Sequence, residues 1–268
     1  MNSQRDNCNI GPTRPGLSDA ARVRPAGISG ATPEVFCNVA DSKKTWLSTG
    51  DPASIKSRTM YVTSTWSVRD TDNSGGRLHL ADGLWRDIDA RKDYGETAIH
   101  AVKALSSTVT MMQRLAIQPE QCSLFASGGK GFQVFIPVTL LMPNGVASAG
   151  IATARIWHHL CRTFVFDNLF TALTDLNIYS GGKGRLFRQP NVQRDSGLYK
   201  VPLRSDEWQG LDVASYTEIC SAPRPTIEPV PVSGIAPTAA GAWACALRKM
   251  VKPVPKPQRK TRMAGSDG

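Results

Sequence analysis

The chain has 268 residues, of which 41% are hydrophobic, and a formal net charge of +10 from 32 lysines and arginines against 22 aspartates and glutamates. This length and composition allow one sizeable hydrophobic core or two small ones. The longest apolar runs are shorter than the roughly 20 residues of a membrane-spanning helix, and the N-terminal stretch lacks the apolar segment of a signal peptide. We therefore expect a cytoplasmic protein with no membrane partner.

The cysteine pattern and the charge narrow the class of protein further. The six cysteines are scattered, and no two of them form a CxxC pair. This spacing is typical neither of a disulfide framework nor of a zinc ribbon, so we expect reduced thiols. The excess of positive charge favours a polyanionic partner such as a nucleic acid.

The first half of the chain predicts an arm, strands and a helix. Residues 1–33 are rich in proline, glycine and arginine, which predicts a disordered N-terminal arm. A strand is predicted over residues 60–68, and a turn at Asp82-Gly83 precedes a further strand. Across residues 96–116 apolar side chains recur every three or four positions, which predicts an amphipathic helix.

The second half alternates between the same kinds of element. Residues 122–142 predict a strand, a glycine turn and a second strand, and a helix is expected over about residues 151–173. Short strands alternate with turns over residues 176–203. This order indicates an α/β (α+β) fold in which neighbouring strands are largely antiparallel.

The C-terminal segment has a different composition. From Ser221 onward there are eight basic residues, two acidic residues and eight of the 18 prolines. This composition predicts that residues 222–268 form a proline-rich, basic, disordered tail. Two roles are open for this tail, a solvated appendage or a non-specific attraction to nucleic acid.

Two aspartates in "LWRDIDA" are the first candidate for chemistry. A strand directs residues i and i+2 to the same face, so Asp87 and Asp89 are expected to project their carboxylates side by side. Mg²⁺ or Mn²⁺ suits such a pair, because these ions take one or two carboxylates together with substrate phosphates. The alternative is a solvent-facing strand end without a ligand.

The pentapeptide SGGKG occurs twice, at residues 127–131 and 180–184, with unrelated flanking sequences. At the first copy the glycines allow a tight turn whose N–H groups can bind an anion, and Lys130 adds a positive charge. The alternative is an ordinary glycine hairpin turn. The pattern GxxxxGK[ST] is absent, so the first copy is not a P-loop.

Three motifs together resemble the archaeo-eukaryotic primase superfamily, in particular the primases and primase-polymerases of plasmids, phages and other mobile elements. The matching segments are "WRDIDA", "SGGKGFQ" and "TDLNIYSGGKGRLFRQPNVQRDSGLYKVPL", and the resemblance covers about residues 60–203. It implies a primase-like catalytic domain over residues 34–215, with mixed, largely antiparallel sheets flanked by helices.

The resemblance implies a role for each matching residue. Asp87, Asp89 and Asp175 would be the catalytic ligands of a two-metal Mg²⁺ or Mn²⁺ site, with Asp167 as a weaker alternative for the third acid. The nucleotide-binding residues would be Ser127, Gly128, Lys130, Gly131, Gln133, Arg185, Arg188 and Lys200. The family usually has histidine at the position of Gln133, although glutamine still donates one neutral hydrogen bond. The second SGGKG is interpreted as a turn that directs the strand "RLFR" towards the metals.

The resemblance therefore predicts a metal-dependent, template-directed nucleotidyltransferase. Its substrates would be nucleoside triphosphates and a single-stranded DNA template, and it would make primers for the replication of a mobile element, with a replicative helicase or initiator as a candidate partner. Two alternatives are open: a gap-filling or repair polymerase with the same site, and a DNA-binding replication initiator with a degenerate site.

Overall fold

The computed structural model describes residues 34–40, 46–49, 61–63, 66–69, 78–81, 83–90, 98–142, 154–180, 186–232 and 234–251. For the strands between residues 34 and 80 it describes the backbone alone. The predicted N-terminal arm (residues 1–33) and residues 252–268 lie outside the described residues, as do Arg185 and most of the second SGGKG turn.

The described strands form two sheets in which every pair of neighbouring strands is antiparallel. One sheet contains β1 (Glu34–Ala40), β2 (Trp46–Thr49), β3 (Tyr61–Thr63), β4 (Trp66–Arg69), β5 (Leu78–Leu80) and β9 (Leu186–Arg188). The other contains β6 (Gly83–Asp89), β7 (Ser123–Ala126), β8 (Gly131–Pro137) and β10 (Val201–Leu203), in the order β10-β7-β8-β6. The strand predicted over residues 60–68 is thus two strands, β3 and β4.

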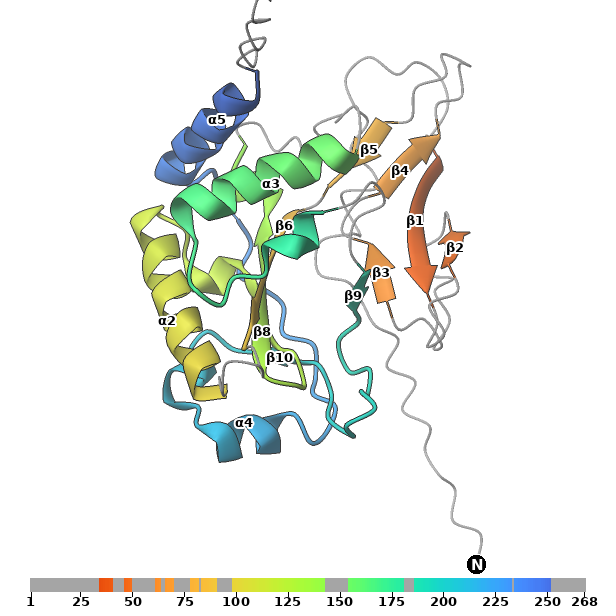
Figure 1. Ribbon diagram of the computed structural model, residues 1–268, viewed down its shortest axis with the longest axis vertical. Helices are drawn as coiled ribbons and strands as arrows, with labels where there is room; N and C mark the ends of the chain where they lie inside the picture. The colour runs from red at the N-terminus through yellow and green to blue at the C-terminus, as the bar shows by residue number, and fades with distance from the viewer. Residues whose placement is uncertain are drawn as a thin grey trace, which may run out of the picture.

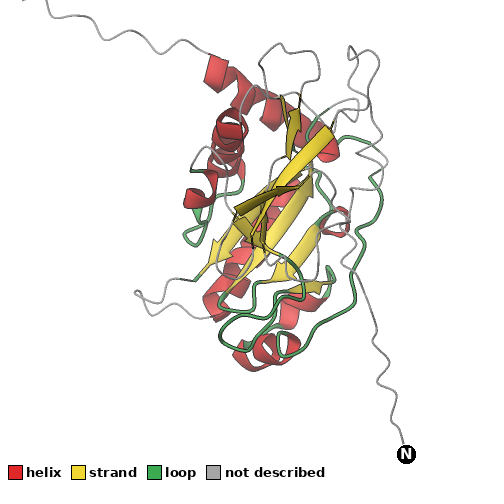
Figure 2. Cartoon of the chain, turned by 90° about the vertical axis from the view of Figure 1, so that its right-hand side faces the viewer, coloured by secondary structure: helices red, strands yellow, loops and turns green. Residues whose placement is uncertain are grey.

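Four α-helices accompany the sheets in the described part of the chain: α2 (Ala98–Arg114), α3 (Ala154–Asn168), α4 (Val213–Ile219) and α5 (Pro237–Val251). Figure 1 shows α2, α3 and α5 on one side of the molecule and β1 to β4 on the other, and in Figure 2 the strands run through the middle. The expectation of a mixed α/β fold with antiparallel strands is confirmed. A primase-like arrangement of these elements stays a prediction.

Helix α2 forms where the apolar rhythm predicts it. Leu105 and Met112 are fully buried, and the helix packs against β6 and β8. It ends at Arg114, and Ala116 then takes a left-handed backbone conformation with φ of 61°.

Helix α3 ends at Asn168, five residues before the predicted end. Leu169 and Leu173 continue the apolar rhythm, and both are buried, but the chain between them no longer follows the helix. The Leu169 carbonyl accepts a hydrogen bond from Arg86 of β6, and the Leu173 carbonyl accepts one from the Asp89 backbone. Contacts with β6 therefore replace the last helical turn.

Aromatic side chains join the two sheets. Trp85 of β6 stacks on Phe187 of β9, with ring centroids 4.7 Å apart and an interplanar angle of 18°. Trp85 also contacts Phe125 and Phe135 within its own sheet. Trp85 thus packs between the sheets.

The prediction of a disordered tail is wrong for residues 237–251, which form α5. Trp243 is 4% exposed, and its ring centroid lies 5.3 Å from those of Trp157 and Phe164 on α3. Lys249 forms an ion pair with Asp167 at 2.7 Å. The alanine-rich segment buries Trp243 on α3, whereas the tail was predicted from a composition averaged over this segment and its proline-rich neighbours.

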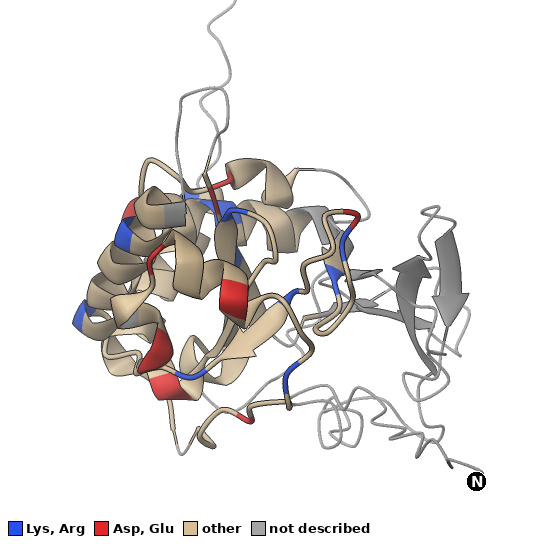
Figure 3. Ribbon diagram, turned by 90° about the horizontal axis from the view of Figure 1, so that it is seen from below, with Lys and Arg blue, Asp and Glu red and all other residues tan. Residues whose placement is uncertain are grey.

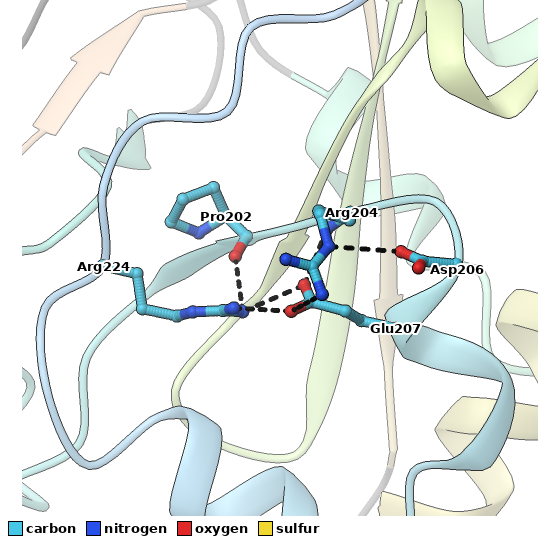
Figure 4. A network of polar contacts seen from close by, with 5 residues as sticks. All are labelled: Pro202, Arg204, Asp206, Glu207 and Arg224. Atoms are coloured by element: carbon cyan, nitrogen blue, oxygen red, sulfur yellow. Dashed lines mark hydrogen bonds and ion pairs between the residues drawn. The ribbon is translucent and has the colours of Figure 1, made fainter.

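The segment before α5 is also attached to the folded part of the chain. Arg224 forms an ion pair with Glu207, which follows β10, and donates to the Pro202 carbonyl at 3.2 Å (Figure 4). The Val230 amide donates to the Glu120 carbonyl at 2.7 Å. The predicted domain boundary near residue 222 therefore does not separate this segment from the fold.

None of the described helices is long and apolar enough to cross a membrane.

Candidate functional site

The acid pair of β6 lies on one face of its sheet, as the alternation of a strand predicts. Ile88 between the two aspartates is fully buried, whereas Asp87 is half-buried and Asp89 is exposed. On the neighbouring strand β8, Asp87 lies opposite Gln133 and Asp89 lies opposite Gly131. The first SGGKG turn is thereby brought to the end of β6 that carries the acids.

The third acid reaches the pair through backbone contacts. Asp175 donates its amide to the Asp87 carbonyl at 3.1 Å, and Thr174 forms an antiparallel bridge with Ile88. One carboxylate oxygen of Asp175 accepts a hydrogen bond from the Asn177 amide at 2.8 Å, which orients the side chain. The alternative acid, Asp167, is instead paired with Lys249 on α5, so it is Asp175 that the structure brings to Asp87.

The electrostatics around Asp87 are dominated by burial and by like charge. Burial, followed by the charges of Asp89 and Asp175, raises the pKa of Asp87 to about 7. A hydrogen bond from Gln133 and the charge of Lys200 act in the opposite direction. Asp89 and Asp175 thus each repel the charged form of Asp87, an arrangement that favours binding of a cation.

The fit of these acids to a divalent ion is partial. Within the described ranges, no three histidine, cysteine or acidic side chains are grouped closely enough to hold a metal ion. The chemistry of the acids nevertheless suits Mg²⁺ or Mn²⁺, because such ions take few carboxylates and complete their shell with water and phosphate oxygens. Asp87, Asp89 and Asp175 are therefore candidate ligands that the described structure does not gather into one closed set.

The first SGGKG turn requires its glycines because the backbone packs closely on its neighbours. Gly128 has φ of +70°, and a side chain there would collide with the Tyr199 carbonyl. A side chain at Gly131 would collide with the Ile88 carbonyl. The turn closes with a hydrogen bond from the Ser127 amide to the Gly131 carbonyl at 2.9 Å. These contacts explain Gly128 and Gly131 without any ligand.

Helix α4 uses part of the hydrogen-bonding capacity of this turn. The Tyr216 hydroxyl donates to the Gly131 carbonyl at 2.8 Å and lies 3.5 Å from the Ser127 hydroxyl. Burial raises the pKa of Tyr216 to about 12, and hydrogen bonds from Ser127 and the Gly129 backbone partly offset this increase. The Gly128 backbone similarly hydrogen-bonds the Cys220 thiol, whose pKa burial raises to about 11. The turn is therefore anchored to α4, which leaves fewer backbone donors for an anion.

Lys130 is the residue of the turn that meets the acids. Its ammonium lies 3.9 Å from the Asp89 carboxylate, and its side chain is 30% exposed. Lys130 thus places a positive charge beside the acids, as its predicted role in phosphate binding requires. Gln133 faces Asp87, and its Oε1 atom is buried without a hydrogen-bond partner in the part of the chain that the structure describes.

The predicted basic residues differ in accessibility. Lys200 is 1% exposed, donates to the Arg188 carbonyl at 2.9 Å and lies over the rings of Trp85 and Phe125. It therefore acts on Asp87 from inside the protein, and a phosphate does not reach it without displacement of these rings. Arg188 is half-buried and donates to the Gln193 carbonyl.

Sequence reasoning missed Arg194, which lies against the first SGGKG turn. Its guanidinium Nη1 atom donates to the Ser127 carbonyl at 3.0 Å, and it lies 3.2 Å from the position that a side chain on Gly129 would occupy. Arg194 lies within the third matching segment, but the resemblance assigns it no role, and its position follows from the loop between β9 and β10. Acidic and basic residues are interspersed over the described part of the chain in the view of Figure 3.

No protein-family model matches the chain, and no curated protein matches it either. The resemblance to the primase superfamily therefore depends on the three motifs and their order.

Proposed function

We propose that the protein is a divalent-metal-dependent nucleotidyltransferase that synthesises primers on single-stranded DNA in the replication of a mobile element. The observation that supports this most directly is the hydrogen bond from the Asp175 amide to the Asp87 carbonyl. It brings the third acid of the motif set to the acid pair across 88 residues of sequence.

The proposed function assigns metal binding to the acids and the orientation of their carboxylates to neighbouring groups. Asp87, Asp89 and Asp175 would hold the metal ions, and Gln133 and the Asn177 amide orient two of these carboxylates. When bound, Mg²⁺ or Mn²⁺ supplies the polarisation of phosphoryl oxygens and the activation of the attacking hydroxyl.

Positive charge approaches the acids from two directions. Lys130 contributes it at the accessible edge of the site, where a triphosphate would enter. Lys200 contributes it from the interior, where it lies over the rings of Trp85 and Phe125. The accessible lysine is therefore the one that we assign to the substrate.

The test is primer synthesis without a primer. The full-length protein, single-stranded DNA, labelled nucleotides and Mn²⁺ or Mg²⁺ should yield labelled products, and Asp87→Asn and Asp175→Asn should abolish them. Asp167→Asn is the matched control, because Asp167 is an acid of similar sequence position that is paired with Lys249. Full activity of the Asp175→Asn variant, or loss of activity in the Asp167→Asn variant alone, would contradict the proposed site.

A DNA-binding replication initiator with a degenerate site is the second candidate. It is favoured by the hydrogen bonds of the Gly128 backbone to Cys220 and of the Gly129 backbone to Tyr216, because these reduce the capacity of the turn to bind a triphosphate. Binding of single-stranded DNA without incorporation on either unprimed or primed templates would identify this alternative. Incorporation on primed templates alone would identify a gap-filling or repair polymerase.

A further inference from the structure

Arg86 is an arginine in the middle of β6, directly before Asp87, and its side chain is fully buried. It lies on the opposite face of the strand from the acids, since side chains alternate along β6. Its guanidinium donates from Nε to the Leu169 carbonyl at 3.0 Å. From Nη2 it donates to the hydroxyls of Thr171 at 3.0 Å and Thr174 at 2.9 Å.

The three acceptors all belong to the segment that leads from α3 to Asp175. Leu169 follows the last residue of α3, where carbonyl groups lack helical partners and a positive charge is favourable. The Thr174 hydroxyl also accepts from the Thr171 amide at 2.8 Å, so that both threonines and Arg86 form one buried polar cluster. Arg86 therefore contacts the segment of residues 169–174 at three of its residues.

The same segment holds Asp175 against Asp87. The Asp89 amide donates to the Leu173 carbonyl at 3.0 Å, and the Asp175 amide donates to the Asp87 carbonyl at 3.1 Å. Thr174 lies between these two bonds, with its backbone bridged to Ile88 and its side chain bonded to Arg86. A change in the Thr174–Arg86 bond is thus expected to reach both backbone bonds.

Fold stability alone is a weak reason for an arginine at this position. Burying a guanidinium is costly, and an apolar side chain of similar volume is often as stable or more stable. No carboxylate pairs with Arg86 among the described residues, and its Nη1 atom is buried with no hydrogen-bond partner there. The buried Arg86 guanidinium, which is costly for stability, lies where Asp175 is hydrogen-bonded to Asp87.

We propose that Arg86 is a positioning residue of the candidate metal site, whose guanidinium holds residues 169–174 so that the Asp175 carboxylate lies beside Asp87. The metal-binding part of this inference rests on the proposed function, whereas the placement of Asp175 does not.

Two measurements on the full-length protein test the two parts separately. Hydrogen exchange of the Asp89 and Asp175 amides reports whether residues 169–175 are held on β6. Binding of Mn²⁺ alone, without nucleotide or DNA, reports whether the acids act as ligands. The variants are Arg86→Met, Arg86→Lys and Thr174→Val. Thr108→Val is the matched control, because Thr108 is a buried threonine of α2 whose hydroxyl bonds the Ala104 carbonyl.

We expect Thr174→Val and Arg86→Met to accelerate exchange of both amides and to weaken Mn²⁺ binding by about 10- to 100-fold, the usual effect of losing a residue that orients a metal ligand. Arg86→Lys should have a smaller effect. Thr108→Val should leave both readouts at parental values, even if it lowers the melting temperature as much as Thr174→Val does. If Arg86→Met does not fold, Thr174→Val carries the test.

Two other outcomes have distinct meanings. If Thr174→Val and Thr108→Val behave alike in exchange and in Mn²⁺ binding, Arg86 has no positioning role and the inference is overturned. If the parent protein binds no Mn²⁺ but exchange of the two amides still depends on Thr174, the proposed function is overturned and the placement of Asp175 by Arg86 stands.

Discussion

Two charged clusters of this protein have opposite electrostatics. Around Asp87, burial and two neighbouring carboxylates raise the pKa of the acid to about 7. Around Glu207, burial also disfavours the charged form, but hydrogen bonds from Arg224 and Arg204 outweigh it and lower the pKa (Figure 4). The Asp87 cluster keeps like charges together, whereas the Glu207 cluster pairs opposite charges.

This difference supports a structural role for the Glu207 cluster, and it is the difference that the proposed metal site at the Asp87 cluster requires. The Glu207 cluster fastens the segment around Arg224 to the loop after β10, and each of its charges has a partner. The Asp87 cluster retains a repulsion that an ordinary structural site would avoid, and perturbed carboxylates of this kind gather at functional sites. Removing a charge should therefore have opposite consequences in the two places.

The largest expected effect is on activity. Asp175→Asn should lower nucleotide incorporation on single-stranded DNA by on the order of 100-fold or more, equivalent to about 2.7 kcal/mol of transition-state stabilisation. Glu207→Gln should leave the rate unchanged at a temperature where both variants are folded. Equal losses in the two variants would show that the clusters do not differ in function.

A smaller effect on substrate binding is expected at Lys130. Lys130→Ala removes the cation that lies 3.9 Å from Asp89, so the apparent KM for the nucleotide should rise about tenfold with a smaller change in kcat. Lys249→Ala is the control, because Lys249 is also paired with an aspartate but on the surface of α5. Steady-state kinetics of the two variants in parallel decide whether Lys130 contacts substrate. A parental KM for Lys130→Ala would exclude it.

For stability, the Glu207 cluster should matter more than the Asp87 cluster, the opposite of the order expected for activity. Glu207→Gln should lower the free energy of unfolding at pH 7 by about 1–2 kcal/mol, since it breaks half-buried, charge-assisted hydrogen bonds. Asp87→Asn should leave this free energy unchanged or raise it, because it relieves repulsion from Asp89 and Asp175. Urea denaturation measures both. The comparison fails if Asp87→Asn is the more destabilising substitution.

The smallest effect is a dependence of the Glu207 contribution on pH. Because the folded pKa of Glu207 lies below its ordinary value of 4.5, its contribution is complete above that pH and is lost as the pH falls through the folded pKa. The difference in unfolding free energy between the parent protein and Glu207→Gln should therefore be constant near neutrality and shrink below pH 4.5. A difference that stays constant down to pH 2 would mean that the carboxylate charge is not what stabilises this cluster.

Much of the local structure could be predicted from sequence. Helix α2 follows from its apolar rhythm, and the shared face of Asp87 and Asp89 follows from strand alternation. Arg86 could also be recognised from the sequence, because it lies on the same face of the strand as the apolar residues Leu84 and Ile88. A charged residue on that face must find partners inside the protein, although the sequence does not say which.

The positions of Arg194 and Tyr216 at the first SGGKG turn had no such signal. Their bonds to the turn span 67 and 85 residues of sequence, and the resemblance assigns a role to neither residue. The burial of Lys200 was equally hidden, since a lysine between two turns has the appearance of an exposed residue. Contacts of this range depend on how the loops and α4 pack, which local patterns do not encode.

The sequence by itself determined helix α2, the strand, turn and strand of residues 122–142, and the acid pair, because periodicity and glycine turns act over a few residues. Only the tertiary structure decided that Asp175 rather than Asp167 joins Asp87, that Lys200 is enclosed by aromatic rings, and that α5 packs on α3. Each of these outcomes depends on the energy of burial and hydrogen bonding between segments far apart in the chain. Such energies are set by the packed arrangement of the whole fold, so they become visible only when the segments are placed together.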